Sequence, residues 1–179
     1  RTTIGGGEGN TANGTEATVG GGTNNTADAL RSTVGGGQNN DATEKVATTV
    51  SGGVDNAATG RWASVGGGKG NDSSADNATV AGGADNEASA QNATVAGGSE
   101  NRAVHGQTTI SGGFDNYANG VNATIGGGYD NDVRSRNATI GGGEKNYADG
   151  EQATVGGGGN GHASGHYSTI GGGFEHIAT

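Results

Sequence analysis

Two polar side chains recur along this chain at a spacing of 15 residues, a threonine hydroxyl and an asparagine amide. A row of hydroxyls on one face of a sheet could order water or pack against a flat partner. A row of amides could bond along a stack of repeats, as in other cross-β arrays. The candidate binding row is Thr3, Thr18, Thr33, Thr49, Ser64, Thr79, Thr94, Thr109, Thr124, Thr139, Thr154 and Thr169. The candidate structural row is Asn10, Asn25, Asn40, Asn56, Asn71, Asn86, Asn101, Asn116, Asn131 and Asn146.

Hydrolytic catalysis does not fit the residue spacing. None of the histidines stands in a repeated arrangement with a nucleophile and a carboxylate, which such catalysis needs. The four histidines are His105, His162, His166 and His176. The glycine triplets are not phosphate loops, because no helix and no Lys-Ser/Thr pair follows them. We therefore expect a protein that is not an enzyme and has no catalytic residue.

Stacked carboxylates are the feature that could attract a metal ion. Asp115 and Asp130 occupy the same position in neighbouring repeats, so they could lie about 5 Å apart. Oxygen ligands of this kind suit calcium, which would relieve the repulsion between the two carboxylates. However, the nonapeptide pattern typical of calcium-binding β-rolls is absent. The sequence therefore predicts no specific metal site and no cofactor.

These side chains are positioned by a repeat that runs from end to end. An apolar β-branched residue recurs twelve times, and ten of the eleven intervals are 15 residues while one is 16. It stands at Ile4, Val19, Val34, Val50, Val65, Val80, Val95, Ile110, Ile125, Ile140, Val155 and Ile170. A fixed period of this length is typical of a solenoid. With this residue as position 0, the threonine row is position −1 and the asparagine row is position +6.

Composition excludes several classes of protein. Only 28% of the 179 residues are hydrophobic, too few for an ordinary globular core, and 42 are glycine. Glycine does not recur at every third residue, which excludes collagen. A net charge of −9 disfavours nucleic acids and anionic membranes as partners. No apolar run approaches the roughly 20 residues of a membrane span, and we expect a single domain over residues 1–179.

Alternation of side chains predicts two short strands per repeat and no helix. Ala17–Gly21 alternates between inward and outward residues with a period of two, and Asn116–Gly120 repeats the pattern. One Val or Ile and two Ala per repeat would form a thin core, in a rod roughly 57 Å long. The Gly-Gly pair at positions +2 and +3 suits turns that need positive φ. The extra residue near Thr43–Thr49 should form a bulge that leaves the face assignment unchanged.

The motif Asn-x-Ala-x-Gly-x-x-Ala-Thr-Val/Ile-Gly, as in Asn116–Gly126, resembles the head repeats of YadA-like trimeric autotransporter adhesins. The resemblance covers the whole chain and implies an all-β fold, a left-handed parallel β-roll of about twelve 15-residue coils. The period is one residue longer than in that family, and Thr stands where its strand carries an outward Ala. The layout is also similar to that of the ryegrass antifreeze β-roll, which implies ice binding by a flat outward face.

The outward positions differ in how uniform they are. Position −1 is Thr apart from Ser64, and position +1 is Gly, Ala or Ser. The turn positions and the second strand vary and hold most of the charges and aromatic residues. Three interpretations of the uniform face stay open. Threonine is simply a good strand residue, or the face packs against another copy of the chain, or it binds ice.

Together these features predict a non-enzymatic extracellular or cell-surface rod, the head or shaft of a trimeric adhesin or tail-fibre-like protein. Its partners would be further copies in a homotrimer and a host surface or glycan; the alternative function is ice binding by the threonine row. End-to-end stacking into a fibre would stay nearly in register, because only two residues are missing to close the repeat. Exposed aromatic residues could contact a ligand, namely Trp62, Phe114, Tyr129, Tyr167 and Phe174.

Overall fold

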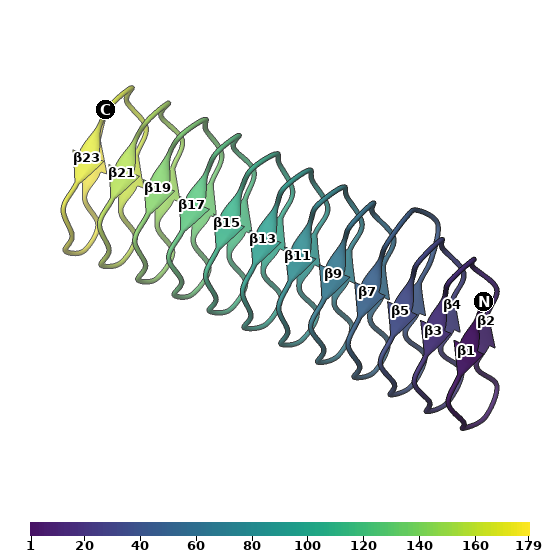
Figure 1. Cartoon of the computed structure of the whole chain (residues 1–179). Helices are drawn as coiled ribbons and strands as arrows, with labels where there is room; N and C mark the ends of the chain where they lie inside the picture. Colours follow the sequence, from purple (N-terminus) through teal and green to yellow (C-terminus); the bar gives the residue numbers. More distant parts are fainter.

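The computed structural model describes all of residues 1–179 and contains no helix. The chain winds into coils stacked along one axis, with the two ends of the chain at opposite ends of the rod (Figure 1). Each coil contributes one strand to each of two parallel sheets, and each sheet has 12 strands. The predicted all-β solenoid, with two short strands per coil, is therefore confirmed. The handedness of the coil, which only the resemblance implies, stays a prediction.

The first sheet contains the odd-numbered strands, each formed by positions −1 and 0 of its repeat. They are β1 (Thr3–Ile4), β3 (Thr18–Val19), β5 (Thr33–Val34), β7 (Thr49–Val50), β9 (Ser64–Val65), β11 (Thr79–Val80), β13 (Thr94–Val95), β15 (Thr109–Ile110), β17 (Thr124–Ile125), β19 (Thr139–Ile140), β21 (Thr154–Val155) and β23 (Thr169–Ile170).

The second sheet contains the even-numbered strands, formed by positions +7 and +8. They are β2 (Thr11–Ala12), β4 (Thr26–Ala27), β6 (Asp41–Ala42), β8 (Ala57–Ala58), β10 (Asp72–Ser73), β12 (Glu87–Ala88), β14 (Arg102–Ala103), β16 (Tyr117–Ala118), β18 (Asp132–Val133), β20 (Tyr147–Ala148), β22 (His162–Ala163) and β24 (Ile177–Ala178).

Each strand pairs in parallel with the equivalent strand of the next coil. Thr79 lies beside Thr94, for example, and Val80 beside Val95. A third ladder of single bridges joins the coils at position +4, from the pair Glu8 and Thr23 to the pair Gly159 and Phe174. Because position +4 has no recurring residue type, the sequence carried no sign of this ladder. Pairing along three lines fixes the backbone position from which each outward side chain projects.

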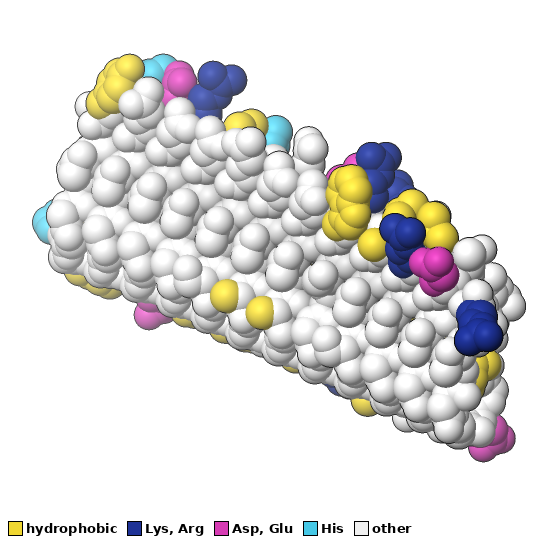
Figure 2. Space-filling model, viewed as in Figure 1, with side chains coloured by type: hydrophobic (Ala, Val, Ile, Leu, Met, Phe, Trp, Pro, Cys, Tyr) yellow, Lys and Arg dark blue, Asp and Glu magenta, His cyan; other side chains and the backbone are white.

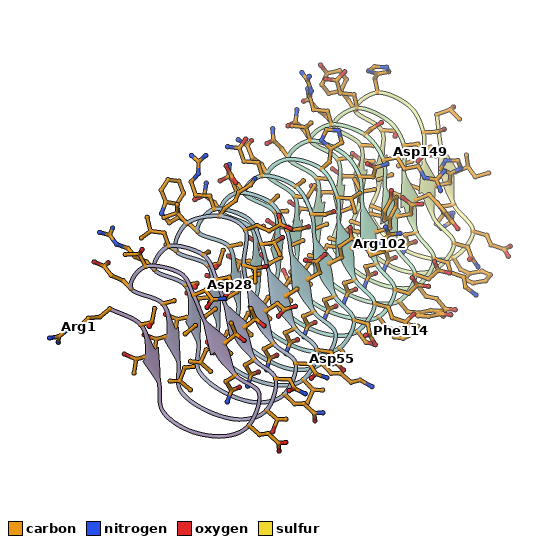
Figure 3. All side chains as sticks on the ribbon, turned by 90° about the vertical axis from the view of Figure 1, so that its right-hand side faces the viewer. Arg1, Asp28, Asp55, Arg102, Phe114 and Asp149 are labelled. Carbon is orange, nitrogen blue, oxygen red and sulfur yellow. The ribbon has the colours of Figure 1, made fainter.

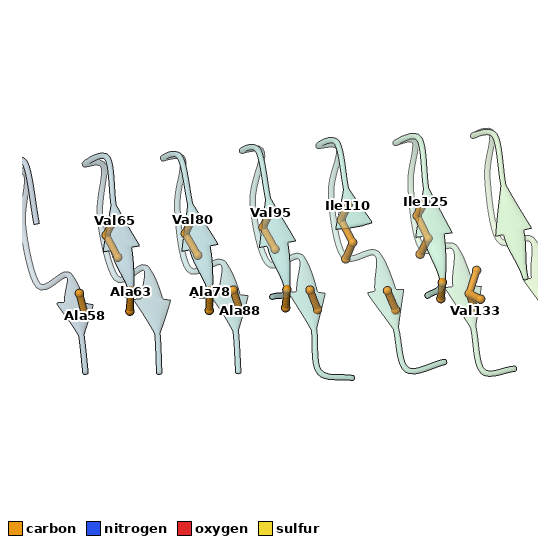
Figure 4. Packing of buried hydrophobic residues seen from close by; sticks show 14 of the residues in the cluster. Ala58, Ala63, Val65, Ala78, Val80, Ala88, Val95, Ile110, Ile125 and Val133 are labelled. Atoms are coloured by element: carbon orange, nitrogen blue, oxygen red, sulfur yellow. The ribbon is translucent and has the colours of Figure 1, made fainter. Parts of the chain in front are cut away.

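The core is a thin layer between the two sheets. The Val or Ile of position 0 faces the residue of position +8 on the opposite sheet, which is usually Ala (Figure 4). These residues and the Ala of position −2 form one cluster of 27 buried side chains. Because alanine reaches only a short way inward, the sheets lie close together and the core has little depth. Each coil buries too little apolar surface to fold alone, so stability comes from contacts between neighbouring coils.

The glycine pair after each odd strand forms the first turn of the coil. Gly98, at position +3, has φ +88, and a Cβ there would lie 2.1 Å from the carbonyl oxygen of Gly113. The prediction that these turns need positive φ is confirmed, and the close approach to the next coil occurs at position +3 and not at position +2. Two more turns with positive φ, at positions +5 and −3, hold other residues, such as Asp115 (φ 55) and Asn122 (φ 58). Asp and Asn adopt this conformation more readily than most residues.

The extra residue of the 16-residue interval lies in the loop between β6 and β7. Thr33 still pairs with Thr49, and Val34 still pairs with Val50. The prediction that the insertion leaves the faces unchanged is therefore confirmed. The predicted bulge is wrong, because the insertion lies in the turn between the strands. Glu44 (φ 69) and Ala47 (φ 57) both take the positive-φ conformation there.

The asparagines of position +6 form a buried hydrogen-bonded ladder inside the turn. The side-chain amide of Asn86 donates to Asn71 Oδ1 at 3.1 Å and to the carbonyl oxygens of Gly82 at 3.0 Å and Gly98 at 2.9 Å. Its own Oδ1 accepts from the backbone and side-chain nitrogens of Asn101, each at 3.1 Å. One side chain thus connects three coils and holds the glycine turn closed.

Replacing a ladder asparagine should destabilise the whole rod. In Asn86→Ala, the buried backbone N–H of Asn101 loses its acceptor and Asn71 Oδ1 loses a donor. The expected loss in unfolding free energy is about 2–3 kcal/mol, measured by urea denaturation. The control is Asn119→Ala, because the half-buried side chain of Asn119 lies outside the ladder. The expected change in unfolding free energy is below about 0.5 kcal/mol. Equal losses in the two variants would contradict a structural role for the ladder.

Candidate functional site

The threonine row lies on the outer side of the first sheet. Each member stacks on its equivalent in the next coil, so the row is continuous from Thr3 to Thr169. The side chains are half-buried along the row and exposed in the two end coils. None of the hydroxyls of the row forms a hydrogen bond within the chain. By contrast, Ser32 and Thr108, each one residue earlier in its coil, donate to backbone carbonyls at 2.7 Å.

The residues of position +1 lie beside this row and are all exposed. Since they are Gly, Ala or Ser, no long side chain rises above the threonines. We call the two rows together the threonine face. Figure 2 shows this face from the front, with side chains in regular rows and charged groups only along its margins. The face therefore offers free hydroxyls and methyl groups in a plane, which suits an ordered water layer or another flat surface.

The outer side of the second sheet carries charges and aromatic rings. Arg102 Nε lies 2.8 Å from Glu87 Oε2 in the previous coil, and its guanidinium lies 5.6 Å from the ring centre of Tyr117 in the next coil. Burial would raise the pKa of Glu87, but hydrogen bonds from Ser89 and Arg102 outweigh this effect and lower it. These contacts use residues of adjacent coils, which stand side by side because of the register.

Two aspartates of the second sheet are poorly solvated. Burial, followed by the negative charge of Glu87 in the next coil, raises the pKa of Asp72 above its ordinary value. Burial also raises the pKa of Asp132, although Arg134 Nη2 lies 2.6 Å from its Oδ2 and opposes the shift. Oδ1 of Asp132 is buried and has no hydrogen-bond partner. The second sheet therefore contains carboxylates whose burial is unfavourable for stability.

The histidines form no catalytic arrangement with a nucleophile. His162 Nε2 lies 2.8 Å from Asp149 Oδ2, and His166 Nδ1 lies 3.9 Å from Glu151 Oε2. No hydroxyl is hydrogen-bonded to either ring. The pairing of His162 with Asp149 could not be read from the sequence, because it joins different positions of neighbouring coils. His105 Nδ1 accepts only the N–H of Gly106, at 3.0 Å.

The two carboxylates considered for calcium lie in one of the turns. Asp115 and Asp130 occupy the same turn of adjacent coils, and both have positive φ. No group of three or more His, Cys, Asp or Glu side chains is placed to hold a metal ion. The structure therefore brings no third ligand of these types to the pair.

Two of the predicted aromatic residues form a pair. Phe114 and Tyr129 stack with ring centres 5.7 Å apart and an interplanar angle of 20°, and each is 41% exposed. The signal that could have predicted this pair is their shared position, +4, in adjacent repeats. Lys145 Nζ lies 5.7 Å from the Tyr129 ring. Trp62 and Tyr167 lie in a different turn, exposed by 53% and 70%.

Comparison with known protein families and with curated proteins finds no match to this chain. The structure contains no helix with the length and apolar character needed to span a membrane.

Asp72→Asn should stabilise the rod near pH 7. The pKa of Asp72 is raised in the folded chain, so the ionised carboxylate destabilises the fold near pH 7. Removing the charge should raise the free energy of unfolding by about 0.5 kcal/mol after allowance for solvent screening. The gain should shrink as the pH falls through the raised pKa of folded Asp72 and disappear below the ordinary pKa, where the side chain is neutral in both the folded and the unfolded chain. Urea denaturation of the wild type and the variant, near pH 7 and near pH 3, measures the difference in unfolding free energy at each pH.

The control for this prediction is Asp41→Asn. Asp41 occupies the same repeat position but is exposed, and it lies between Thr26 and Ala57, which are uncharged. Its replacement should change stability little at either pH. A gain for Asp72→Asn that persists at low pH would show that desolvation of the carboxylate is not the cause.

Proposed function

We propose that this chain is a non-enzymatic, extracellular rod, the head or shaft of a trimeric adhesin or tail-fibre-like protein. The observation that carries the proposal is the unbroken register of both sheets across all twelve coils. Such a rod holds each variable side chain at a set height and on a set side. It can therefore project and display side chains without needing a catalytic centre.

The threonine face is the surface proposed to contact other copies of the chain. It is flat and uncharged, and its hydroxyls have no partners within the chain. The opposite sheet carries the ion pairs and aromatic rings, for example Glu87 with Arg102. Packing of the threonine faces around a shared axis would leave the charged sheet and the turns exposed for display. This arrangement also agrees with the resemblance to trimeric adhesin heads.

The mass in solution tests this proposal most directly. Light scattering over a series of concentrations should give three times the chain mass of 17.1 kDa. Thr94→Lys places a charge in the middle of the threonine face and should dissociate the trimer, because an unpaired charge in an interface is costly. Thr26→Lys, the same substitution on an outward position of the second sheet, should leave the mass unchanged.

A monomer at every concentration would contradict the trimer. The equal spacing of free hydroxyls and methyl groups along the threonine face would then favour ice binding, the second candidate function. In that case the chain should show thermal hysteresis in a freezing assay, and Thr94→Lys should reduce it while Thr26→Lys should not. A monomer without thermal hysteresis would remove both functions from this face.

A further inference from the structure

One hollow interrupts the surface of the rod, near its C-terminal end. It has a volume of about 510 Å³ and spans three coils at the corner between the second sheet and the following turn. Long side chains gather around Asp149 in this region (Figure 3). No apolar side chain lines the hollow. It is lined by Arg134, Ser135, Arg136, Asp149, Gly150, Glu151, Ser164 and His166.

The hollow exists because small residues lie between two rows of longer ones. Ser135 and Gly150, at position +10, form the floor. At Gly150, a Cβ would lie 2.0 Å from the carbonyl oxygen of Gly165, so this floor cannot accept a larger residue without movement. Position +9 supplies Arg134 and Asp149 to one wall. The other wall consists of position +11 residues of successive coils, among them Arg136 and Glu151.

Most of the charged groups here already have partners. Arg134 is held by Asp132 at 2.6 Å, and Asp149 is held by His162 at 2.8 Å. Glu151 has only the loose contact with His166, at 3.9 Å. Arg136 is exposed and has no ion pair. The hollow therefore offers a free guanidinium beside carboxylate and hydroxyl oxygens that can still accept hydrogen bonds.

This combination selects a ligand by its chemistry. A guanidinium binds a carboxylate through two parallel hydrogen bonds. The oxygens of Glu151 and Ser164 would accept hydrogen bonds from sugar hydroxyls. The carboxylate of Glu151 would repel a phosphate, which carries a charge of about −2, more strongly than a ligand with a single carboxylate. A wholly polar lining gives no affinity for a lipid or an aromatic ligand. Because the hollow is open to solvent and wholly polar, it suits weak binding of a hydrophilic ligand through a few polar contacts.

We infer that the hollow is a binding site for a carboxylated saccharide, with Arg136 holding the carboxylate and Glu151 and Ser164 holding hydroxyls. The inference rests on the proposed display function, because it names the class of ligand that one part of the displayed surface would bind. The sugar acid has two common chemical sources, a uronic acid and a sialic acid. Both place a carboxylate on a ring that carries several hydroxyls.

Nuclear magnetic resonance titration of the full chain tests the inference. The probes are methyl β-D-glucuronide, methyl α-N-acetylneuraminide and, as the neutral control, methyl β-D-glucoside. At least one acidic sugar should shift the backbone amide signals of Arg136, Glu151 and Ser164 and saturate with a Kd on the order of 1 mM. The neutral glucoside should bind about tenfold more weakly, because it lacks the charge-assisted pair.

Matched variants separate a site from a general surface effect. Arg136→Gln should weaken binding of the acidic sugar about tenfold. Arg61→Gln alters the same repeat position in a coil outside the hollow and should bind as the wild type does. Absence of saturable shifts with both acidic sugars, equal binding of the neutral glucoside, or normal binding by Arg136→Gln would each overturn the inference. None of these results affects the mass in solution, so the proposed trimeric rod is tested separately.

Discussion

Apart from the insertion between β6 and β7, each residue of a coil lies against its equivalent in the next coil, and the rest of the structure depends on this constraint. The strands are only two residues long, so no single coil contains a stable element. What holds the coils together is the sum of parallel backbone pairing, the asparagine ladder and the thin layer of Val, Ile and Ala. A residue that does not fit its position disturbs the coils on both sides of it. Positions that face inward or approach a neighbouring backbone therefore accept few residue types.

The same constraint separates the two outer surfaces. Stacking brings identical repeat positions side by side, so a row of one charge would repel itself. The threonine face avoids the difficulty by holding no charge. The second sheet and the turns hold charges of both signs, and adjacent coils often pair them, as in Glu16 with Arg31 at 2.9 Å. Where like charges do stack, as with Asp72 and Glu87, burial and then the neighbouring charge of Glu87 raise the pKa of Asp72. A uniform face and a variable face thus follow from one packing rule.

The features that were predictable from the sequence are those with one residue type per position. The period predicted the number of coils, and alternation predicted the strand of position 0 and its partner at position +8. The uniform Thr and Gly positions indicated which face is flat. Features that combine different positions were not predictable. The bridge ladder at position +4 has mixed residues, the pair of His162 and Asp149 joins two coils, and the hollow needs side chains from three coils.

The loop between β6 and β7 accepts one extra residue while the coils on either side keep their register. The turn is therefore tolerant of length, whereas the strands and the glycine turn are not. A peptide grafted at this corner would project from the rod without disturbing the coils beneath it. Whole coils are interchangeable in their backbone pairing, because each one meets its neighbours through the same strand ladders. Genes for such a chain can gain or lose one repeat by duplication or deletion and still encode a continuous rod. The length of the rod can therefore evolve independently of the surface that it displays.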